Sequence, residues 1–292
     1  SGFSREQKSI PLFETIRALK KAETDERIKG VYIDVRHFSS GWASLQELRR
    51  AVVDFRKSKK FVYAFADSYD EKGYYLASSA DRVYMEPYGE LEVNGLGMSA
   101  PFFKGLLEKL EVKPLIFRVG KFKAAVEPFL LDKMSDENRL QNQTLLNDIW
   151  TVSSREMLEG KKISPEEFNS GVGTLRFSAA AEAKAAGLVD LAYEDEVLKI
   201  MATLAKPEHE GQSDPDLLNP VHYISESKIR TKLSSSDVIA VLVAEGEIVK
   251  GPGGRDQIGE ESIARDLHEI RDDKDVKAVV IRVNTPGGDA LA

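Results

Sequence analysis

Helical and strand-like segments alternate along most of this chain: apolar residues recur at helical spacing, and β-branched and aromatic residues gather in short runs between them. The expected helices lie near 10–23, 45–55, 71–79, 102–111, 136–160 and 192–205. The expected strands are 28–35, 61–66, 82–85, 114–119, 238–243 and 276–283. Ser135, Ser164 and Ser178 each stand where an N-cap residue would begin a helix. This alternation predicts an α/β fold in which helices cover a parallel sheet.

Composition and charge narrow the possible functions. With 292 residues, the chain fits one large or two smaller domains, and its 42% hydrophobic content is enough for a packed core. A net charge of -7 gives no basic footprint, so nucleic acid is not expected as a partner. The absence of cysteine excludes disulfides, thiolate metal sites and a cysteine nucleophile. No apolar run approaches the length of a transmembrane helix, and the N-terminus lacks a signal-peptide pattern.

The end of the chain repeats the pattern of its beginning. A shift of 248 positions superimposes a helix–strand unit near the N-terminus on a second such unit without a gap. The matched residues are Arg17 with Arg265, Leu19 with Leu267, Asp25 with Asp273, Lys29 with Lys277, Val31 with Val279, Ile33 with Ile281 and Val35 with Val283. We interpret this match as a duplication; chance similarity between two amphipathic units is the alternative.

The repeat divides the chain into three parts. Residues 1–205 form a first repeat, 206–236 form a linker or irregular crossing segment rich in Pro, Ser, Asp and Glu, and 237–292 begin a second repeat. The strand 238–243 has no counterpart before the first repeat, and only one helix and one strand follow it. Because a piece of this size cannot close a core of its own, we expect a truncated second repeat and a chain that is a fragment of a longer protein.

The stretch 117–129 places two lysines among apolar residues and small alanines. A lysine that loses part of its hydration shell is less stable as an ammonium ion, and the free amine can then act as a general base for a hydroxyl nucleophile. We assign this role to Lys123 and interpret Lys121 as an ordinary solvated charge. A solvated surface charge is also the alternative for Lys123. Glu127 either orients the lysine loop or is a surface charge itself.

A second candidate site follows the last expected strand. Residues 285–289 read Thr-Pro-Gly-Gly-Asp, a turn in which no side chain shields the backbone N–H groups of Gly287 and Gly288. Such amides can stabilise the oxyanion of an acyl-transfer reaction. A plain turn that binds nothing is the alternative.

These motifs together resemble one family. A strand followed by Asn-Thr-Pro-Gly-Gly is similar to the oxyanion-hole turn of the ClpP/crotonase superfamily. The stretch 117–129 closely resembles the catalytic-lysine motif of the signal peptide peptidase A (protease IV) family in its long, duplicated form. Residues 73–78 with 80–84, and Ala183 with 187–190, resemble further elements of that family. The likeness runs in register over nearly the whole chain, and the lysine stretch is its most specific part.

The resemblance implies a ClpP/crotonase-like βαβ spiral in tandem repeat, and peptide-bond hydrolysis by a Ser/Lys dyad. It places the general base at Lys123 and the oxyanion turn at Gly287 and Gly288, whereas the nucleophilic serine is expected beyond residue 292. The first repeat carries Glu71 at the position that corresponds to this serine, so it has no nucleophile of its own. Asp289 departs from the serine that often follows the two glycines. The 292-residue chain alone is therefore expected to be an inactive part of a serine protease.

The resemblance also implies partners and a location. It suggests peptide substrates, in particular apolar signal-peptide remnants, and a homo-oligomer. It suggests attachment to the extracytoplasmic face of the cytoplasmic membrane through an anchor outside this sequence. No cofactor and no metal is expected.

Other functions have less support in the sequence. The four histidines, at positions 37, 209, 222 and 268, are scattered and fit neither a Ser/His/Asp triad nor a His-Glu-x-x-His metal site. The glycine-rich residues 251–254 are not followed by the Gly-Lys-Ser/Thr of a phosphate loop. Two alternatives stay open. One is a non-catalytic scaffold that binds peptides or partner subunits, with Lys123 in a structural ion pair, and the other is a crotonase-type acyl-CoA enzyme.

Overall fold

A computed structural model describes residues 11–36, 40–205, 215–226, 237–254 and 256–292. The chain divides into two compact units, unit 1 (Ser1–Lys228) and unit 2 (Ile229–Ala292). Parallel strands pair in both units, which confirms the α/β class predicted from the sequence. None of the helices in the described ranges combines the length and the apolar character needed to cross a bilayer.

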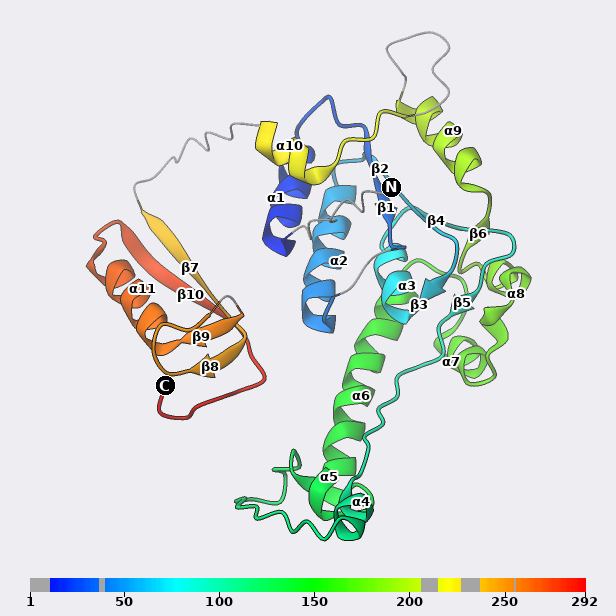
Figure 1. The fold of residues 1–292 in the computed structure, drawn as a ribbon. Coiled ribbons are helices and arrows are strands. Elements are labelled where there is room, and N and C mark those ends of the chain that lie inside the picture. The colour runs from blue at the N-terminus through cyan, green and yellow to red at the C-terminus, as the bar shows by residue number, and fades with distance from the viewer. Residues whose placement is uncertain (1–10, 37–39, 206–214, 227–236, 255) are drawn as a thin grey trace, which may run out of the picture. The chain divides into compact units, whose positions relative to one another are not determined.

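Unit 1 is built on a four-stranded parallel sheet (Figure 1). Its strands lie in the order β1 (Gly30–Asp34), β2 (Phe61–Ala66), β4 (Arg82–Met85) and β6 (Asp190–Leu191). The register places Gly30 opposite Phe61 and Tyr63 opposite Arg82. A short parallel pair joins β3 (Tyr69–Asp70) to β5 (Leu91–Glu92). Parallel neighbours need crossover connections, and the helices of unit 1 provide them.

Capping side chains begin two of these helices. Ser135 and Ser164 each accept a hydrogen bond on Oγ from the amide three residues later, at 3.1 Å in both cases, which confirms these predicted N-caps. The third predicted cap, Ser178, is wrong because it ends a short 3-10 turn and α8 begins after Ala179. The helices of unit 1 are α1 (Leu12–Ala22), α2 (Trp42–Arg56), α3 (Glu71–Ala77), α4 (Lys104–Lys109), α5 (Glu127–Leu130), α6 (Asp136–Met157), α7 (Pro165–Gly173), α8 (Ala180–Ala185), α9 (Glu194–Ala205) and α10 (Pro220–Glu226).

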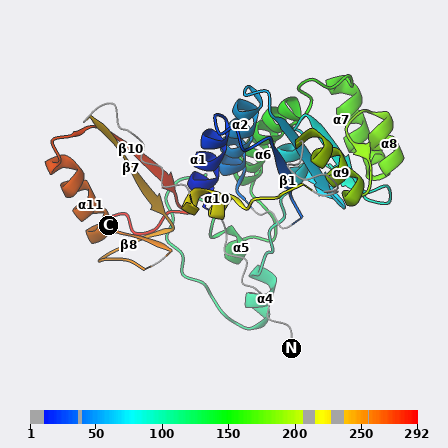
Figure 2. The ribbon, with the colours of Figure 1, turned by 90° about the horizontal axis from the view of Figure 1, so that it is seen from above.

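Strand β2 separates two apolar clusters, because successive side chains of a strand point to opposite faces of the sheet. Val62 and Ala64 are buried in the larger cluster, to which α1, α2 and α3 contribute. Phe65 lies in the smaller cluster with Val197 and Met201 of α9. Helices therefore cover both faces of the sheet, with α1 and α2 on one side and α9 on the other (Figure 2).

The guanidinium of Arg49 joins three parts of the core of unit 1. Arg49 is buried on α2 and donates hydrogen bonds to the carbonyl of Tyr75 in α3, to Ser78 Oγ at 2.7 Å and to the carbonyl of Glu156 in α6. Its Nε lies 3.8 Å from Oε2 of Glu156, and the same carboxylate accepts a hydrogen bond from the Tyr75 hydroxyl. Burial lowers the pKa of Arg49, and the acceptors around it compensate for the lost water.

Helix α6 leads away from this core (Figure 1). Its buried residues all lie near its C-terminal end, and Met157 is the largest of them. Its N-terminal end lies beside α5, which in turn contacts α4 through a stack of Phe103 and Phe129 with ring centroids 6.0 Å apart. The lysine stretch belongs to this outer part of unit 1.

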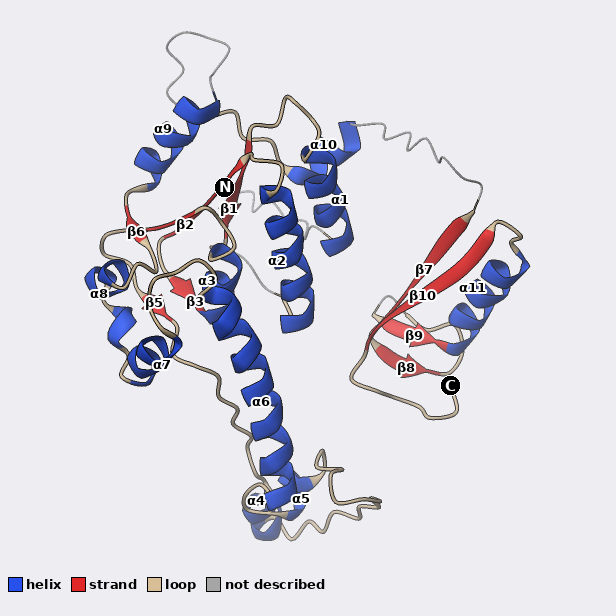
Figure 3. Cartoon of the chain, turned by 180° about the vertical axis from the view of Figure 1, so that it is seen from behind, coloured by secondary structure: helices blue, strands red, loops and turns tan. Residues whose placement is uncertain are grey.

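Unit 2 packs one helix against a pair of parallel strands (Figure 3). Its elements are β7 (Val238–Glu245), β8 (Glu247–Val249), β9 (Gln257–Gly259), α11 (Glu260–Asp272) and β10 (Val276–Asn284). Strand β7 pairs with β10 and β8 pairs with β9, both in parallel. Leu242 and Ala244 of β7 are buried, whereas Ile239, Val241 and Val243, which alternate with them, are exposed.

Segments that correspond under the 248-position shift fold alike. Helix α1 begins at Leu12, and α11 begins at Glu260, which is the corresponding position. Each helix is followed by a strand that pairs in parallel with a neighbour. The duplication itself, and the division into 1–205, 206–236 and 237–292, stay predictions.

One further prediction about local structure, the strand at 114–119, is wrong. Residues 114–119 form no strand, although their apolar alternation suits one, because no described strand lies beside them to pair with their N–H and C=O groups. The segment 206–236 is not irregular throughout, because α10 lies within it and packs on α1. Lys21 Nζ lies 4.2 Å from the ring centroid of Tyr223, whose hydroxyl donates to Asp25 Oδ2 at 3.0 Å. Residues 206–214 and 227–236 of this segment lie outside the described residues.

Replacing Arg49 by alanine is expected to lower the free energy of unfolding of unit 1 by about 3–5 kcal/mol, because the carbonyls of Tyr75 and Glu156 lose their donor and the partly buried Glu156 carboxylate loses its cation. Urea denaturation followed by tryptophan fluorescence measures this change, since both tryptophans lie in unit 1. Arg50→Ala, at the exposed neighbouring position of α2, is the control and should change the free energy by less than about 0.5 kcal/mol. Equal stability of Arg49→Ala and the wild type would contradict this role.

Candidate active site

Lys123 lies in a loop between α4 and α5 of unit 1. The loop turns at Gly120, whose φ of 94° is a conformation that favours glycine. The amide of Lys123 donates to the carbonyl of Gly120 at 3.4 Å, and the amide of Glu127 donates to the carbonyl of Ala124 at 3.0 Å. These short-range bonds fold the loop into successive turns and leave the side chain of Lys123 exposed.

The apolar neighbours of Lys123 do not enclose it. Leu115, Phe117 and Val119 are 89%, 98% and 90% exposed, and Phe122 is exposed as well. The loss of hydration that the sequence suggests for Lys123 is therefore not produced by the described part of unit 1 alone. It requires another surface that covers the loop.

The two lysines of the stretch differ in their contacts. The side chain of Lys121 is 81% exposed and its Nζ lies 3.9 Å from Oε1 of Glu137, as suits an ordinary surface charge. Lys123 forms an ion pair with no acidic side chain in the described ranges. The scaffold alternative, in which Lys123 is a structural ion-pair residue, has no support in these contacts.

Glu127 is the buried charge of this region. Its side chain is 0% exposed, so of the two interpretations of Glu127 the surface charge is excluded. Burial disfavours the ionised form, but hydrogen bonds from Ser135 and Asn138, with a contribution from Arg118, outweigh it and hold the pKa of Glu127 below its usual value. The sequence offered one signal for this contact, the predicted N-cap at Ser135, but gave no sign that Glu127 shares it.

Glu71, at the position that corresponds to the expected serine, is the first residue of α3. Its Oε1 accepts a hydrogen bond from the amide of Asn94 at 2.7 Å. The preceding residue, Asp70, caps the helix by accepting from the amide of Gly73 at 2.6 Å. In this structure the Glu71 carboxylate therefore binds a backbone amide.

The glycine turn of unit 2 follows β10 and lies against β8. The amide of Ile248 donates to the carbonyl of Gly287 at 3.0 Å, and the amide of Asp289 donates to the carbonyl of Ile248 at 2.9 Å. Gly288 has a φ of 155°, and a Cβ at this position would lie 2.1 Å from the carbonyl oxygen of Ile248. Close backbone approach therefore requires glycine at 288.

The two candidate oxyanion amides are not equivalent. The amide of Gly287 already donates to Thr285 Oγ1 at 3.0 Å. The amide of Gly288 donates to none of the residues that the structure describes. An anion can therefore accept a hydrogen bond from the amide of Gly288 without displacing an existing one. For the amide of Gly287 it would compete with the Thr285 hydroxyl. Lys123 belongs to unit 1 and this turn belongs to unit 2, so the two candidate parts of the site lie in different units.

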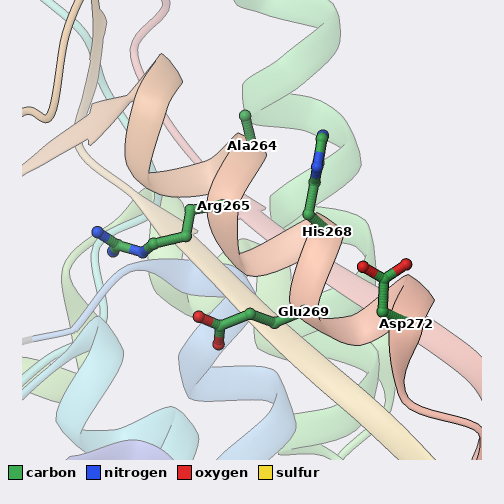
Figure 4. Close-up of a pocket in the computed structure, with 5 residues that line it drawn as sticks. All are labelled: Ala264, Arg265, His268, Glu269 and Asp272. Carbon is green, nitrogen blue, oxygen red and sulfur yellow. The ribbon is translucent and has the colours of Figure 1, made fainter.

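Two hollows in the surface are lined by other residues. A hollow along α11 is lined by Ala264, Arg265, His268, Glu269 and Asp272, and Figure 4 shows these side chains spreading from one helix without meeting at a point. A hollow in unit 1 is lined by α6, α7 and the segment at Gly95 and Leu96. There Trp150 Nε1 donates to Asn169 Oδ1 at 3.0 Å. Neither hollow contains Lys123, Gly287 or Gly288.

Comparison with known proteins identifies the family of this chain. The model of peptidase family S49 matches residues 54–208, which is more than half of the chain. The chain belongs to peptidase family S49. The matched range includes Lys123, Glu127 and Glu71, whereas the glycine turn of unit 2 lies outside it.

The S49 chain is similar to several curated proteases. It is 34% identical over 295 residues to Protease 4 of Haemophilus influenzae, covering 98% of this chain and 48% of that protein. It is 30% identical over 290 residues to Protease 4 of Salmonella typhi, covering 96% and 46%. It is 31% identical over 303 residues to the chloroplastic serine protease SPPA of Arabidopsis thaliana, covering 99% and 43%. These matches confirm the resemblance to signal peptide peptidase A, and the chain spans about half the length of these relatives.

By shape, the S49 chain is similar to an enoyl-CoA hydratase/isomerase from Marinobacter aquaeolei. The two share 16% sequence identity, with coverage of 68% of this chain and 88% of that chain and a TM-score of 0.21. So low a TM-score supports no argument about the chemistry of this chain.

Gly288→Ala should open the turn of unit 2, because its Cβ cannot lie 2.1 Å from the carbonyl oxygen of Ile248. Amide hydrogen exchange at Ile248 and Asp289, whose bonds hold the turn, is expected to become about tenfold faster or more. Gly254→Ala is the matched control, because its Cβ would meet only the flexible end of Gln257, at 3.2 Å. Unchanged exchange in Gly288→Ala would contradict the close packing described here.

Proposed function

We propose that this S49 chain supplies the general base of a serine peptidase that uses a Ser/Lys dyad. The observation that supports this most is the setting of Lys123, which lies within the range matched by the family model, on an exposed loop, without an ion-pair partner in the described ranges. A lysine held in an ion pair would stay charged and could not accept a proton. The serine would come from residues outside this sequence, since the relatives are about twice as long as the part that matches.

In the proposed mechanism, the uncharged amine of Lys123 accepts the hydroxyl proton of the serine while the serine oxygen attacks the peptide carbonyl. The carbonyl oxygen becomes an oxyanion, for which the amides of Gly287 and Gly288 are the proposed donors. Gly288 is the stronger candidate because its amide has no acceptor among the described residues. The ammonium of Lys123 then returns its proton to the amine that leaves as the C–N bond breaks.

The same proposal extends to substrate, assembly and location. Apolar peptides such as signal-peptide remnants are the proposed substrates, and the exposed side chains of Leu115, Phe117 and Val119 beside the lysine loop offer apolar surface that a peptide or a covering subunit would bury. Such a cover would also remove water from Lys123, as a neutral amine requires. A homo-oligomer at the extracytoplasmic face of the cytoplasmic membrane, held by an anchor outside this sequence, completes the proposal and rests on the family resemblance.

Lys123→Ala in the full-length protein is expected to lower kcat/KM for peptide cleavage by about 10²–10⁴-fold, because the general base is lost. Lys121→Ala is the matched control: this lysine is 81% exposed, and its loss should change activity by less than about twofold. Cleavage at the wild-type rate by a folded Lys123→Ala variant would overturn the proposal that Lys123 is the general base.

A serine-directed acylating probe tests the division of the dyad. It is expected to label the full-length protein and to leave the 292-residue chain unlabelled, as detected by mass spectrometry of the intact protein. Labelling of the 292-residue chain at a single serine would show that it carries a nucleophile of its own, and the split arrangement would then be wrong.

A further inference from the structure

The carboxylate of Glu127 is buried at the base of the lysine loop, four residues after Lys123. Glu127 is the first residue of α5, and its side chain is 0% exposed although the loop that precedes it is mostly exposed. A buried carboxylate is costly unless hydrogen bonds replace its lost water. The mechanism proposed above gives Glu127 no part in proton transfer.

The N-terminal end of α6 supplies three donors to this carboxylate. Ser135 donates from Oγ to Oε1 of Glu127 at 2.5 Å and from its amide to Oε2 at 3.2 Å. Asn138 donates from Nδ2 to Oε2 at 2.8 Å. Ser135 Oγ also accepts from the amide of Asn138 at 3.1 Å, so it caps α6 and holds Glu127 at once. A negative charge at this helix end is further stabilised by the helix dipole.

Arg118 joins the same carboxylate to the backbone of Lys123. Its Nη1 lies 3.6 Å from Oε1 of Glu127 and donates to the carbonyl of Lys123 at 3.4 Å. The side chain of Arg118 is 36% exposed, so the bridge lies between the buried carboxylate and the exposed loop. One side chain therefore links the residue proposed as the base to the start of α6.

We propose that Glu127 is a positioning residue: through Arg118 on one side and Ser135 with Asn138 on the other, its carboxylate fixes the backbone of Lys123 relative to α6. This inference rests on the proposed function of Lys123 as general base. It concerns the geometry of the loop, and Glu127 itself neither touches the substrate nor exchanges a proton.

The arrangement requires a carboxylate, and a neutral amide of the same shape cannot replace it. Both oxygens of Glu127 face donors, from Ser135, Asn138 and Arg118. Gln at this position would turn an NH₂ group toward one of these donors and leave at least one of them without an acceptor. Asp keeps both oxygens but is shorter by one methylene, so it should restore the contacts in part.

The test compares Glu127→Gln with Glu127→Asp in the full-length protein. Glu127→Gln is expected to lower kcat by about tenfold or more while KM changes by less than about twofold, because a displaced base slows the chemical step and leaves substrate binding in place. Glu127→Asp should recover part of the lost kcat. Glu137→Gln, a nearby glutamate whose contact is the surface lysine Lys121, is the matched control and should keep kcat within about twofold of the wild type.

A second measurement follows the loop directly in the 292-residue chain. Glu127→Gln should speed amide hydrogen exchange at Lys123 and Glu127, whose bonds close the loop, without changing exchange in β2 and β4 of the core. Should Glu127→Gln fail to fold, Arg118→Met removes the bridge at a partly exposed position and is expected to lower kcat in the same direction.

Each outcome decides the matter. Faster loop exchange together with reduced kcat supports the positioning role. Unchanged exchange in the loop overturns it, and so does faster exchange with full kcat. If Lys123→Ala is itself active, the proposed base and its positioning fall together, whereas an inactive Lys123→Ala beside a fully active Glu127→Gln removes the positioning role alone.

Discussion

A buried guanidinium is stable only if its N–H groups donate hydrogen bonds to nearby acceptors. The fold of unit 1 depends on the acceptors that surround Arg49. Arg49 lies on α2. Its acceptors are the carbonyl of Tyr75 in α3, the hydroxyl of Ser78 directly after α3, and the carbonyl of Glu156 in α6. The contact holds the C-terminal end of α6 against the core. The whole of α6 is 22 residues long, about 33 Å at the usual rise per residue, and its other end lies well outside the core.

Helix α6 also connects the core of unit 1 to the lysine loop. Its first turn holds the Glu127 carboxylate, and Arg118 connects that carboxylate to the backbone of Lys123. Buried polar groups at the two ends of one helix therefore determine where an exposed lysine stands. Proton transfer takes place only within hydrogen-bond reach, so a base on a loop needs such an anchor. The exposed apolar residues before Lys123 show that the described part of unit 1 does not exclude water from the loop.

The parts of the structure that the sequence predicts well are those set by local pattern. Strands β2 and β4 end where their apolar runs end, and the N-cap at Ser135 depends on an amide only three residues away. Residues 114–119 form a similar apolar run, but a strand exists only where a neighbouring strand pairs with it. Glu127 is buried because it contacts Ser135 at the N-terminal end of α6. The residues next to Glu127 in the sequence do not predict this contact. Gly287 and Gly288 look alike in sequence and differ because the Thr285 hydroxyl turns toward one of them.

We propose that the nitrogen of Lys123 meets a serine supplied by residues outside this sequence. The most direct test is a crystal structure of the full-length protein with that serine acylated by a peptide-like inhibitor. Lys123 Nζ is expected within about 2.6–3.2 Å of the serine oxygen, in a site closed to bulk water. A structure in which this nitrogen stays in solvent or joins a carboxylate, while another group contacts the serine, would contradict it.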